Sequence, residues 1–588
     1  MTTRLNTTRP LPALGRSSIT DRVRAAYERI EASDRPEVWI ALENRDDVLG
    51  RALELDRRLQ RGEADSLPLA GLLVAVKDNI DVAGLPTTAA CPSFAYSPAV
   101  SSTVVDRLTQ AGALVLGKTN LDQFATGLVG TRSPYGAVRH ATRPGHVSGG
   151  SSSGSAVAVA LGLVDIALAT DTAGSGRVPA ALHGLIGIKP TLGLIPTEGV
   201  VPACRSYDSV AIFAQDLPTA QRALAVVVGP AHTDPSSRSW PTSTRLAPRQ
   251  RTRIGVPAPA DLGLLSVEAQ AAFSDAVQRL NACGMETVTV DLAPFLRAAR
   301  LLYDGALVAE RYEAAGASVA AGAPGLDPTV AQIVRAAGTI PAHRLVADRA
   351  LLDTLRAQAV QVFDSYHGPK TGVDALLLPT TTEHPTLAAV EAEPLEINAR
   401  MGTFTNFVNL CDLSAIAVPA GTADGSPFGV SFIGPAFADQ VILDLAASFL
   451  GQEENPALLP TDTLDLVVFG AHLRGQPLNG QLTELGARHA GTVHTAPEYR
   501  MVRLAGEPAR PGVSPVSSGG TALVGERWTL TKTALATFLT VLPPRMSIGP
   551  ITLDDGGQVL GFQCTTSDGA EDISAYGGWA RYLAARPR

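Results

Sequence analysis

Residues 149–177, GGSSSGSAVAVALGLVDIALATDTAGSGR, decide the fold of the central part of the chain. After the Gly/Ser-rich start, the Ala- and Val-rich composition of Ser155–Leu163 predicts a helix, and Ile166–Ala169 follows as a predicted strand. A second Gly-rich turn, residues 170–177, ends the stretch. The sequence therefore predicts two loops of small residues that flank one helix and one strand.

The same alternation of apolar runs and Gly-rich turns extends from Leu69 to Lys189. Leu72–Val76 and Leu114–Gly117 are predicted strands, and Ser102–Gln110 between them is a predicted helix. Alternating strands and helices imply an α/β fold, in which helices cover both faces of a sheet.

Further elements are predicted up to residue 450. Residues 232–253 are polar and rich in Pro and Ser, which predicts a surface excursion. Helical periodicity is found at 19–32, 269–283, 296–314, 347–363 and 439–450, and strand signals are found at 375–378, 415–418 (followed by a turn at Pro419–Gly421) and 429–433.

The length of 588 residues exceeds what one hydrophobic core usually organises. Gln452–Asp462 has linker composition, and short β-rich segments surround Gly-rich turns beyond it, at 464–469, 500–504 and 522–524. We therefore expect a large α/β domain over residues 1–455, a linker over 456–462 and a small α+β domain over 463–588.

Composition narrows the possible classes of function. The net charge is −8 without a basic cluster, which argues against nucleic acids and anionic membranes as partners and favours a small-molecule substrate. The longest apolar stretch, residues 156–169, is interrupted by Asp165 and is shorter than the roughly 20 residues that span a bilayer. Residues 1–16 lack the apolar core of a secretory signal, so we expect a cytoplasmic protein.

Cysteine and lysine usage adds two constraints. The five cysteines are scattered and form no CxxC pair, which argues against a disulfide framework and against a zinc site. Only five of the 48 Lys and Arg residues are lysines, so a retained lysine is a candidate for a role that needs an amine able to lose its proton. These lysines are Lys77, Lys118, Lys189, Lys370 and Lys532.

The first Gly/Ser loop, Gly149–Ser155, precedes a helix, where backbone amides favour negative charge. It is not a Walker phosphate loop because no Gly-Lys-Ser/Thr follows, and a linker or a simple helix cap is the alternative. The loop also fits the G-x-S-x-G motif of α/β-hydrolases, with Ser152 as nucleophile. That motif needs an apolar strand directly upstream, whereas residues 139–147 are polar.

Ser175 lies in the second turn between small residues, which let a substrate approach the backbone closely. The successive amides of Thr172, Ala173, Gly174 and Ser175 are candidates for an oxyanion hole. On this motif alone, a tight turn without a catalytic role explains the residues equally well.

The two loops follow a lysine in a specific order. Lys77 ends the first apolar strand, Ser151 and Ser175 lie in the two loops, and Ile188–Thr191 reads Ile-Lys-Pro-Thr just downstream. Order, spacing and flanking residues resemble the amidase signature family from about residue 65 to about residue 450. The resemblance implies a mixed central sheet covered by helices, and an amide hydrolase that needs neither a metal nor an organic cofactor.

The resemblance also implies a Ser-Ser-Lys triad. Ser175 is then the nucleophile, Ser151 follows a cis peptide and relays the proton, and Lys77 is the base. A serine hydroxyl needs a neighbouring base to become a good nucleophile. A lysine base must be neutral, so its pKa has to fall from about 10.4 to near 7 through burial or positive surroundings. We therefore predict that Lys77 is buried.

Three segments resemble the allophanate hydrolase subgroup of this family. The second turn reads AGSGRVP over Ala173–Pro179, where other members more often have Gly-Gly-Ser-Ile-Arg. The loop Asn120–Arg132 resembles the active-site loop of the subgroup, and a predicted helix over Leu302–Tyr312 resembles its substrate-binding helix.

By this resemblance, Tyr303, Arg311 and Gly127 bind the substrate. Tyr303 and Arg311 are eight residues apart and so share one face of the predicted helix. The planar fork of Arg311 suits a carboxylate, and allophanate is a urea with one carboxylate. The alternatives are a solvent-facing charge for Arg311 and a core aromatic for Tyr303.

Two C-terminal segments, 468–479 and 572–579, resemble the start and the end of the accessory domain of allophanate hydrolases. Cleavage of allophanate yields N-carboxycarbamate, which must still lose carbon dioxide, and His472 is a candidate for that second step. A single histidine in a Gly-rich loop is more often structural, so both interpretations stay open.

The resemblance as a whole implies hydrolysis of allophanate (urea-1-carboxylate) to ammonia and carbon dioxide through an acyl-enzyme. It also implies a homodimer and a functional link to a urea carboxylase or to a biuret-type degradation pathway. The alternatives are an amidase for another small amide such as malonamate, an amidotransferase subunit that supplies ammonia to a tRNA-bound acyl group, and a catalytically inactive scaffold.

Overall fold

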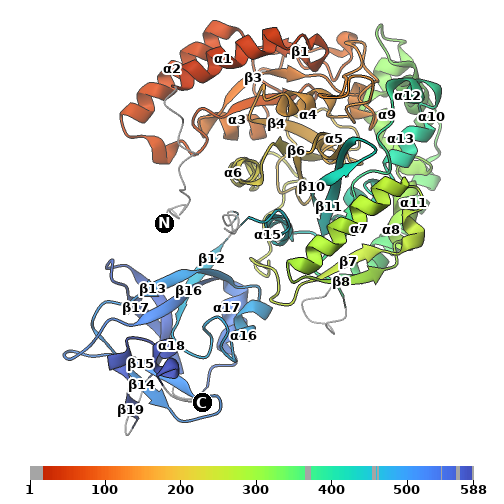
Figure 1. The fold of residues 1–588 in the computed structure, drawn as a ribbon. Helices are drawn as coiled ribbons and strands as arrows, with labels where there is room; N and C mark the ends of the chain where they lie inside the picture. The colour runs from red at the N-terminus through yellow and green to blue at the C-terminus, as the bar shows by residue number, and fades with distance from the viewer. Residues whose placement is uncertain are drawn as a thin grey trace. The chain divides into compact units, whose positions relative to one another are not determined.

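The computed structural model of the protein describes residues 18–363, 372–452, 459, 462–543, 546–564 and 570–585. These residues form two compact units (Figure 1). The second unit consists of Trp240–Thr252 and the described residues from Asp462 onward, and the first unit contains the others. Most of the predicted linker, 456–462, lies outside the described residues. None of the helices in the described ranges is both long and apolar enough to cross a membrane.

The first unit is built on one mixed sheet, which confirms the predicted α/β fold. In spatial order, its eleven strands within the described residues are β1 (Trp39–Leu42), β3 (Leu114–Thr119), β2 (Leu73–Lys77), β4 (Ile166–Asp171), β6 (Ser209–Ala214), β5 (Ile186–Lys189), β10 (Ser414–Ala423), β11 (Ser426–Gly434), β9 (Ala375–Pro379), β7 (Arg253–Pro257) and β8 (Glu286–Val290). Strands β3, β2 and β4 run parallel to one another, whereas β6, β5, β10 and β11 pair antiparallel with their neighbours.

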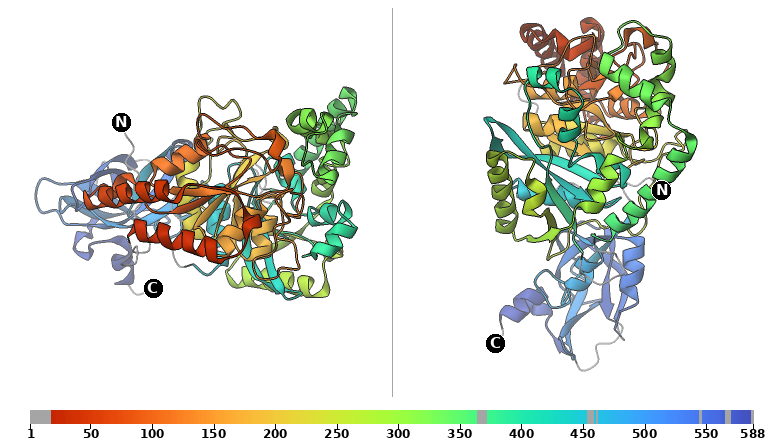
Figure 2. Two further views of the ribbon diagram at one scale, coloured as in Figure 1. Left: turned by 90° about the horizontal axis from the view of Figure 1, so that it is seen from above. Right: turned by 90° about the vertical axis from the view of Figure 1, so that its right-hand side faces the viewer.

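Helices cover both faces of this sheet. They are α1 (Ile19–Ala32), α2 (Arg45–Gln60), α3 (Thr103–Gln110), α4 (Ser153–Ala160), α5 (Val178–His183), α6 (Leu217–Val227), α7 (Val267–Ala282), α8 (Ala293–Arg300), α9 (Ala309–Ala320), α10 (Pro328–Ala337), α11 (Ala342–Val360), α12 (Leu387–Ala392), α13 (Glu396–Met401), α14 (Asn406–Leu410) and α15 (Asp439–Phe449). Helix α4 contacts α5, α3 contacts α6, and Figure 1 shows the two pairs on opposite sides of β4 and β6. Helices α1 and α2, red in Figure 2, pack against each other beside β3. Because β2, β4 and β6 are buried on both faces, their sequences are continuous apolar runs.

The predicted helix over Leu302–Tyr312 is wrong in its first half, because α8 and α9 are separate helices. Between them, the Ala306 amide donates to Asp348 Oδ2 on α11 at 2.6 Å. A Cβ at Gly305 would lie 2.8 Å from the same oxygen, so a larger residue there would collide with it. This long-range contact interrupts the helical periodicity that the sequence shows over residues 296–314.

The predicted turn at Pro419–Gly421 is a β-bulge instead. Strand β10 continues to Ala423, and its register with β11 shifts between Pro419 and Gly421. Gly421 has a φ of 129°, which glycine adopts easily, so the strand bends without ending.

Part of the predicted surface excursion, residues 232–253, belongs to the second unit. Leu246 is only 1% exposed. Its amide donates to the carbonyl of Gly486 at 2.9 Å, and its own carbonyl accepts from Arg488 Nη1 at 3.0 Å. The polar composition of this stretch therefore did not predict that one of its apolar residues, Leu246, is buried in the second unit.

The second unit has the predicted α+β composition. One sheet contains β13 (Arg488–His494), β16 (Val524–Thr531), β12 (Thr463–Val468), β18 (Gln558–Cys564) and β17 (Met546–Thr552), another contains β15 (Arg510–Pro515), β14 (Tyr499–Leu504) and β19 (Glu571–Asp572), and the helices are α16 (Gly480–Glu484), α17 (Lys532–Leu539) and α18 (Trp579–Ala584). The predicted strands at 464–469 and 500–504 correspond to β12 and β14, whereas the strand predicted at 522–524 begins only at Val524.

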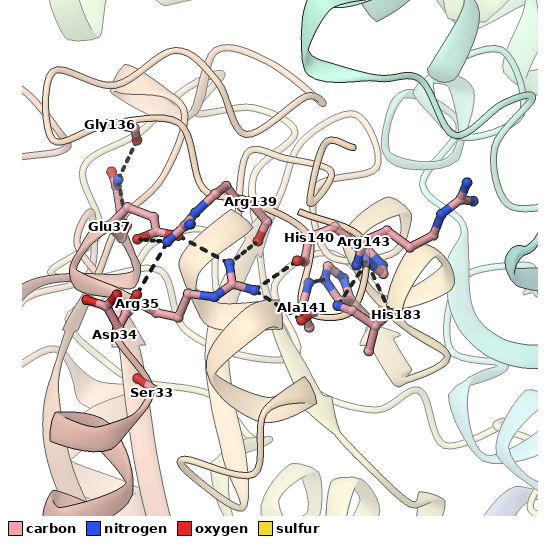
Figure 3. A network of polar contacts seen from close by, with 12 residues as sticks. Ser33, Asp34, Arg35, Glu37, Gly136, Arg139, His140, Ala141, Arg143 and His183 are labelled. Atoms are coloured by element: carbon pink, nitrogen blue, oxygen red, sulfur yellow. Dashed lines mark hydrogen bonds and ion pairs between the residues drawn. The ribbon is translucent and has the colours of Figure 1, made fainter. Parts of the chain in front are cut away.

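A polar network holds the chain that leads into the first Gly/Ser loop (Figure 3). Arg35, which follows α1, donates to the carbonyls of His140 and Ala141 at 2.9 and 3.1 Å. Glu37 accepts from Arg139 at 2.8 Å. The segment after the N-terminal helix is thereby tied to the residues that enter the loop.

Beside this network lie four histidines whose rings pack in succession, the histidine stack: His140, His146, His183 and His384. The rings of His140 and His183 are stacked with centroids 4.1 Å apart. Each of these two rings donates to a backbone carbonyl of α5 and accepts from a backbone amide of residues 141–143, at 2.8–3.2 Å. Such pairing requires neutral imidazoles. Burial lowers the pKa of His384 to about 3 and also lowers the pKa of His140 and of His183.

We predict that His384→Gln flattens the acid side of the stability profile. The folded-state pKa of His384, about 3, lies below its ordinary value of 6.5, so the stability it contributes is fully present above pH 6.5 and is lost as the pH falls toward 3. Urea titrations between about pH 4 and 6 should show that the free energy of unfolding depends less steeply on pH in the variant. The slope should fall by up to ~1.4 kcal/mol per pH unit, which corresponds to one proton. The exposed His343 provides the control. An equal change of slope in His343→Gln would contradict the prediction.

Candidate active site

Lys77 and Ser151 are in direct contact. The Nζ of Lys77, the last residue of β2, donates to Ser151 Oγ at 2.8 Å and to Thr170 Oγ1 at 2.7 Å. Strands β2 and β4 are parallel neighbours, so Lys77 and Thr170 both lie at the C-terminal ends of these strands, on the same side of the sheet's strand ends. Ser151 reaches them from the loop before α4. The structure thus brings together two of the three predicted triad residues through one hydrogen bond.

Lys77 is buried, as predicted, and it has no carboxylate partner. Its side chain is 0% exposed and forms no ion pair within the described ranges, whereas the buried Lys118 pairs with Asp78 at 3.0 Å. Burial lowers the pKa of Lys77 from 10.5 to about 7, although three nearby carboxylates act in the opposite direction. A neutral amine is therefore available close to neutral pH.

The backbone around Ser151 is fixed by the loop Asn120–Arg132. The Gly150–Ser151 peptide bond is cis, as the family resemblance implies. The carbonyl of Ser151 accepts from the Asp122 amide at 3.1 Å, and the Gly150 amide donates to the Leu128 carbonyl at 2.8 Å. A Cβ at Gly150 would lie 2.0 Å from Asp122 Oδ2, so only glycine fits there. The two loops therefore pack directly against each other.

Asp171, at the end of β4, organises the turn that contains Ser175. Its carboxylate accepts from the amides of Gly174 and Gly176, each at 2.9 Å. It also accepts from Nε and Nη2 of Arg177, both at 2.9 Å. Burial alone would raise the pKa of Asp171, but the contacts with Arg177 outweigh it and the pKa is lowered. Asp171 is therefore held as a carboxylate that shapes the turn.

The four predicted oxyanion donors reduce to three in this structure. The Gly174 amide already donates to Asp171, because the Asp side chain folds back on the turn that follows it. The amides of Thr172, Ala173 and Ser175 donate to no acceptor among the described residues. The Ser175 hydroxyl, 3% exposed, also has no hydrogen-bond partner in that part of the chain. Ser175 thus follows β4 with its hydroxyl and its amide both free.

The predicted substrate residues also come together. Arg311 is 2% exposed, which excludes a solvent-facing charge. Its Nη2 donates to the Tyr303 hydroxyl at 3.0 Å, and its Nη1 donates to Thr126 Oγ1 at 2.9 Å. Gly127 directly follows Thr126, and a Cβ there would lie 2.5 Å from Asp122 Oδ2. Tyr303 reaches Arg311 from the turn between α8 and α9, and not from the same helix.

Thr170, Asp122 and Asp171 contribute to the site in ways that the sequence patterns did not assign. Thr170 and Asp171 are polar residues at the end of a buried parallel strand, where functional groups of α/β sheets gather. Asp122 is an acid in a loop that is otherwise almost uncharged. These positions in the sequence were the signals that could have identified the three residues. Their contacts left no sequence pattern, because the groups that they contact are either distant in sequence or belong to the backbone.

His472 lies in the second unit. Its ring stacks on Phe562 with centroids 5.2 Å apart, and its Nε2 lies 2.9 Å from Gln481 Oε1. Burial lowers its pKa. It lines a small cavity of about 30 Å³ together with Arg510. These contacts fit a structural residue as well as a ligand-binding one. Across the described ranges, no group of three or more His, Cys, Asp or Glu side chains is arranged to hold a metal ion.

We predict that Asp171→Asn strongly destabilises the first unit. The change leaves Arg177, whose side chain is 0% exposed, as a buried charge without a carboxylate. Breaking such a pair costs about 3–5 kcal/mol. Unfolding in guanidinium chloride, followed by circular dichroism, should show this loss. Glu313→Gln removes the exposed pair with Arg205 and should cost less than about 1 kcal/mol. Equally small losses in both variants would contradict the prediction.

Comparisons with known proteins agree on the family. The family model "Amidase" matches residues 21–443, and the model "Allophanate hydrolase C-terminal domain" matches residues 464–584. The solved structure of Kluyveromyces lactis allophanate hydrolase is 37% identical, with a TM-score of 0.86 and 97% of each chain covered.

Curated relatives extend this similarity. The urea amidolyase of Lachancea kluyveri is 41% identical over 93% of this chain, which spans only 31% of the length of that relative. A glutamyl-tRNA(Gln) amidotransferase subunit from Symbiobacterium thermophilum is 34% identical over 70% of this chain and 90% of its own length. The chain therefore belongs to the amidase family, and beyond its amidase region it has a domain of the type found at the C-terminus of allophanate hydrolases.

Proposed function

We propose that the protein hydrolyses allophanate to ammonia and carbon dioxide. The observation that most directly supports hydrolysis is the contact between the buried Lys77, with its pKa of about 7, and Ser151. The buried guanidinium of Arg311, which has no carboxylate partner in the described residues, supports a small substrate with one carboxylate. The similarity to an allophanate hydrolase over nearly the whole chain supports the same substrate.

The proposed reaction begins at Ser175. Neutral Lys77 accepts a proton from Ser151 while Ser151 accepts the proton of Ser175, whose Oγ attacks the terminal amide carbonyl of allophanate. The free amides of Thr172, Ala173 and Ser175 stabilise the negative charge that forms on the carbonyl oxygen. The proton then returns through Ser151 to the amide nitrogen. Ammonia leaves, and an acyl-enzyme remains on Ser175.

Water completes the cycle. A water molecule gives its proton to the same Ser151–Lys77 path and attacks the acyl carbonyl. The ester bond to Ser175 breaks, and Ser175 regains its proton. The product, N-carboxycarbamate, then loses both of its carboxyl groups as carbon dioxide and takes up two protons, which leaves a second ammonia. Formation and hydrolysis of the acyl-enzyme use only side chains and backbone amides of this chain and water.

The carboxylate end of the substrate is assigned to Arg311, Tyr303 and Gly127. Arg311 supplies the positive charge, and the Tyr303 hydroxyl beside it supplies a further donor. Gly127 follows Thr126 in the same loop, and the absence of a side chain there lets the loop pack closely against Asp122. With this subsite, we expect a carboxylate-bearing urea to be preferred over a simple amide.

We also propose the wider setting of the enzyme. The amidase domain spans residues 1–455, a linker spans 456–462 and the accessory domain spans 463–588, with Trp240–Thr252 added to the accessory domain by its packing. The protein acts in the cytoplasm as a homodimer. A urea carboxylase, or a biuret-degrading pathway, supplies its substrate. The similarity to urea amidolyases supports the first of these sources.

An amidotransferase subunit is the competing function, because such a protein is among the relatives. The second unit argues against it, since residues 464–584 match the C-terminal domain of allophanate hydrolases. Ammonia release from allophanate by the protein alone, without tRNA or other proteins, separates the two functions.

We predict that kcat/KM for ammonia release from allophanate rises with pH through an apparent pKa near 7 and then levels off. Below this pH Lys77 is protonated and cannot accept a proton, and above it the amine is neutral. Lys77→Ala should lower turnover at least about a thousandfold. Lys532, more than half exposed, provides the control, and Lys532→Ala should retain the wild-type rate. A flat profile between about pH 6 and 8, or wild-type turnover in Lys77→Ala, would refute the role of Lys77.

We predict that Arg311→Lys raises KM for allophanate at least about tenfold, because lysine keeps the charge but loses the planar fork. Competition with biuret, in which an amide replaces the carboxylate, reports how far the preference for the acid has fallen. Arg349→Lys, on the exposed side of α11, is the matched control. If KM stays unchanged, Arg311 does not recognise the carboxylate.

A further inference from the structure

The guanidinium of Arg311 is held at both Nη atoms, whereas its Nε has no hydrogen-bond partner in the part of the chain that the structure describes. Its Nη1 donates to Thr126 Oγ1 at 2.9 Å and lies 3.5 Å from the Ala125 carbonyl. Its Nη2 donates to the Tyr303 hydroxyl at 3.0 Å. Its Nε is buried and has no hydrogen-bond partner among the described residues. The edge formed by Nε and Nη2 therefore retains unused donors.

Another buried arginine of this protein shows what that edge does when a carboxylate is present. Arg177 binds Asp171 through Nε and Nη2, both at 2.9 Å. Two parallel N–H donors match the two oxygens of a carboxylate, which makes this pairing strong and directional. The corresponding edge of Arg311 lacks only the carboxylate.

From these contacts we propose that Thr126 determines substrate specificity as a positioning residue for Arg311. Its hydroxyl, with the Ala125 carbonyl, occupies Nη1 and turns the Nε–Nη2 edge toward the carboxylate of the substrate. Tyr303, already at Nη2, adds its hydroxyl to the same carboxylate. This inference rests on the proposed function and specifies how the enzyme recognises the acid end of allophanate.

Thr126 is itself fixed on several sides. Its hydroxyl donates to the Phe124 carbonyl at 3.2 Å, and its carbonyl accepts from Arg132 Nη1 at 3.0 Å. Phe124 and Ala125 have φ angles of 51° and 52°, a left-handed conformation that non-glycine residues adopt only when their surroundings enforce it. A rigid acceptor at this position gives Arg311 one orientation.

The surroundings leave the Arg311 charge without a fixed carboxylate partner. Asp208 is the carboxylate whose pKa is influenced by Arg311, and burial keeps that pKa raised. Its oxygens accept from the Thr172 hydroxyl and from the amides of Ala203 and Cys204. Since Asp208 is committed to these donors, a substrate carboxylate supplies the missing partner of Arg311.

The test compares Thr126→Val with Thr126→Ser in the protein of residues 1–588. Valine keeps the shape of threonine but has no acceptor for Nη1, whereas serine keeps the hydroxyl. We expect Thr126→Val to raise KM for allophanate about tenfold, with the loss on KM rather than on kcat, and Thr126→Ser to restore KM to within about threefold. A merely structural defect would instead lower kcat, because the same loop also holds Ser151 through Asp122.

The outcomes distinguish this inference from the function on which it rests. A raised KM in Arg311→Lys with an unchanged KM in Thr126→Val overturns the role of Thr126 and leaves the proposed function intact. A loss in Thr126→Val that falls on kcat, or that serine fails to restore, overturns it as well. Wild-type protein that releases no ammonia from allophanate overturns both.

Discussion

The site depends on keeping one amine uncharged beside two hydroxyls. Lys77 ends a strand that is buried on both faces, and its nitrogen contacts Ser151 and Thr170 instead of a carboxylate. Three carboxylates nearby, those of Asp122, Asp171 and Asp208, attract a proton to it. Each of them already accepts hydrogen bonds from at least two backbone amides. Burial therefore outweighs their attraction, and the amine can take up a proton near neutral pH.

The same three carboxylates also hold the loops of the candidate site in place. The side chain of Asp122 accepts from backbone amides of its own loop, and its backbone amide donates to the Ser151 carbonyl. Asp171 accepts from the Gly174 amide and so shapes the turn that contains Ser175. Asp208 accepts from the Thr172 hydroxyl. The same three carboxylates therefore influence both the conformation of these loops and the proton affinity of Lys77. We expect a change to any one of these acids to alter both the position of a loop of the candidate site and the electric field at the amine.

Much of the fold was accessible from sequence, because strands buried on both faces leave continuous apolar runs that periodicity detects. Motifs in a fixed order identified Lys77, Ser151 and Ser175 as candidates for the catalytic triad. Two of the failures share one cause, namely contacts that leave no periodic pattern in the sequence. The Ala306–Asp348 hydrogen bond breaks a helix that the pattern continues. Likewise, the side chain of Asp171 takes the Gly174 amide out of the predicted oxyanion hole.

The segment Trp240–Thr252 gives the polypeptide an unusual topology. The chain leaves the first unit after Ser239, contributes Leu246 to the second, and returns at Arg253 to form β7 in the main sheet. A polypeptide ended near residue 460 would retain Leu246 but lose Gly486 and Arg488, so an apolar side chain and two backbone groups would face water. The residues of the second unit are consequently interrupted in sequence by those of the first. A recombination event that transfers the gene segment for only one unit leaves an exposed apolar segment in the resulting protein.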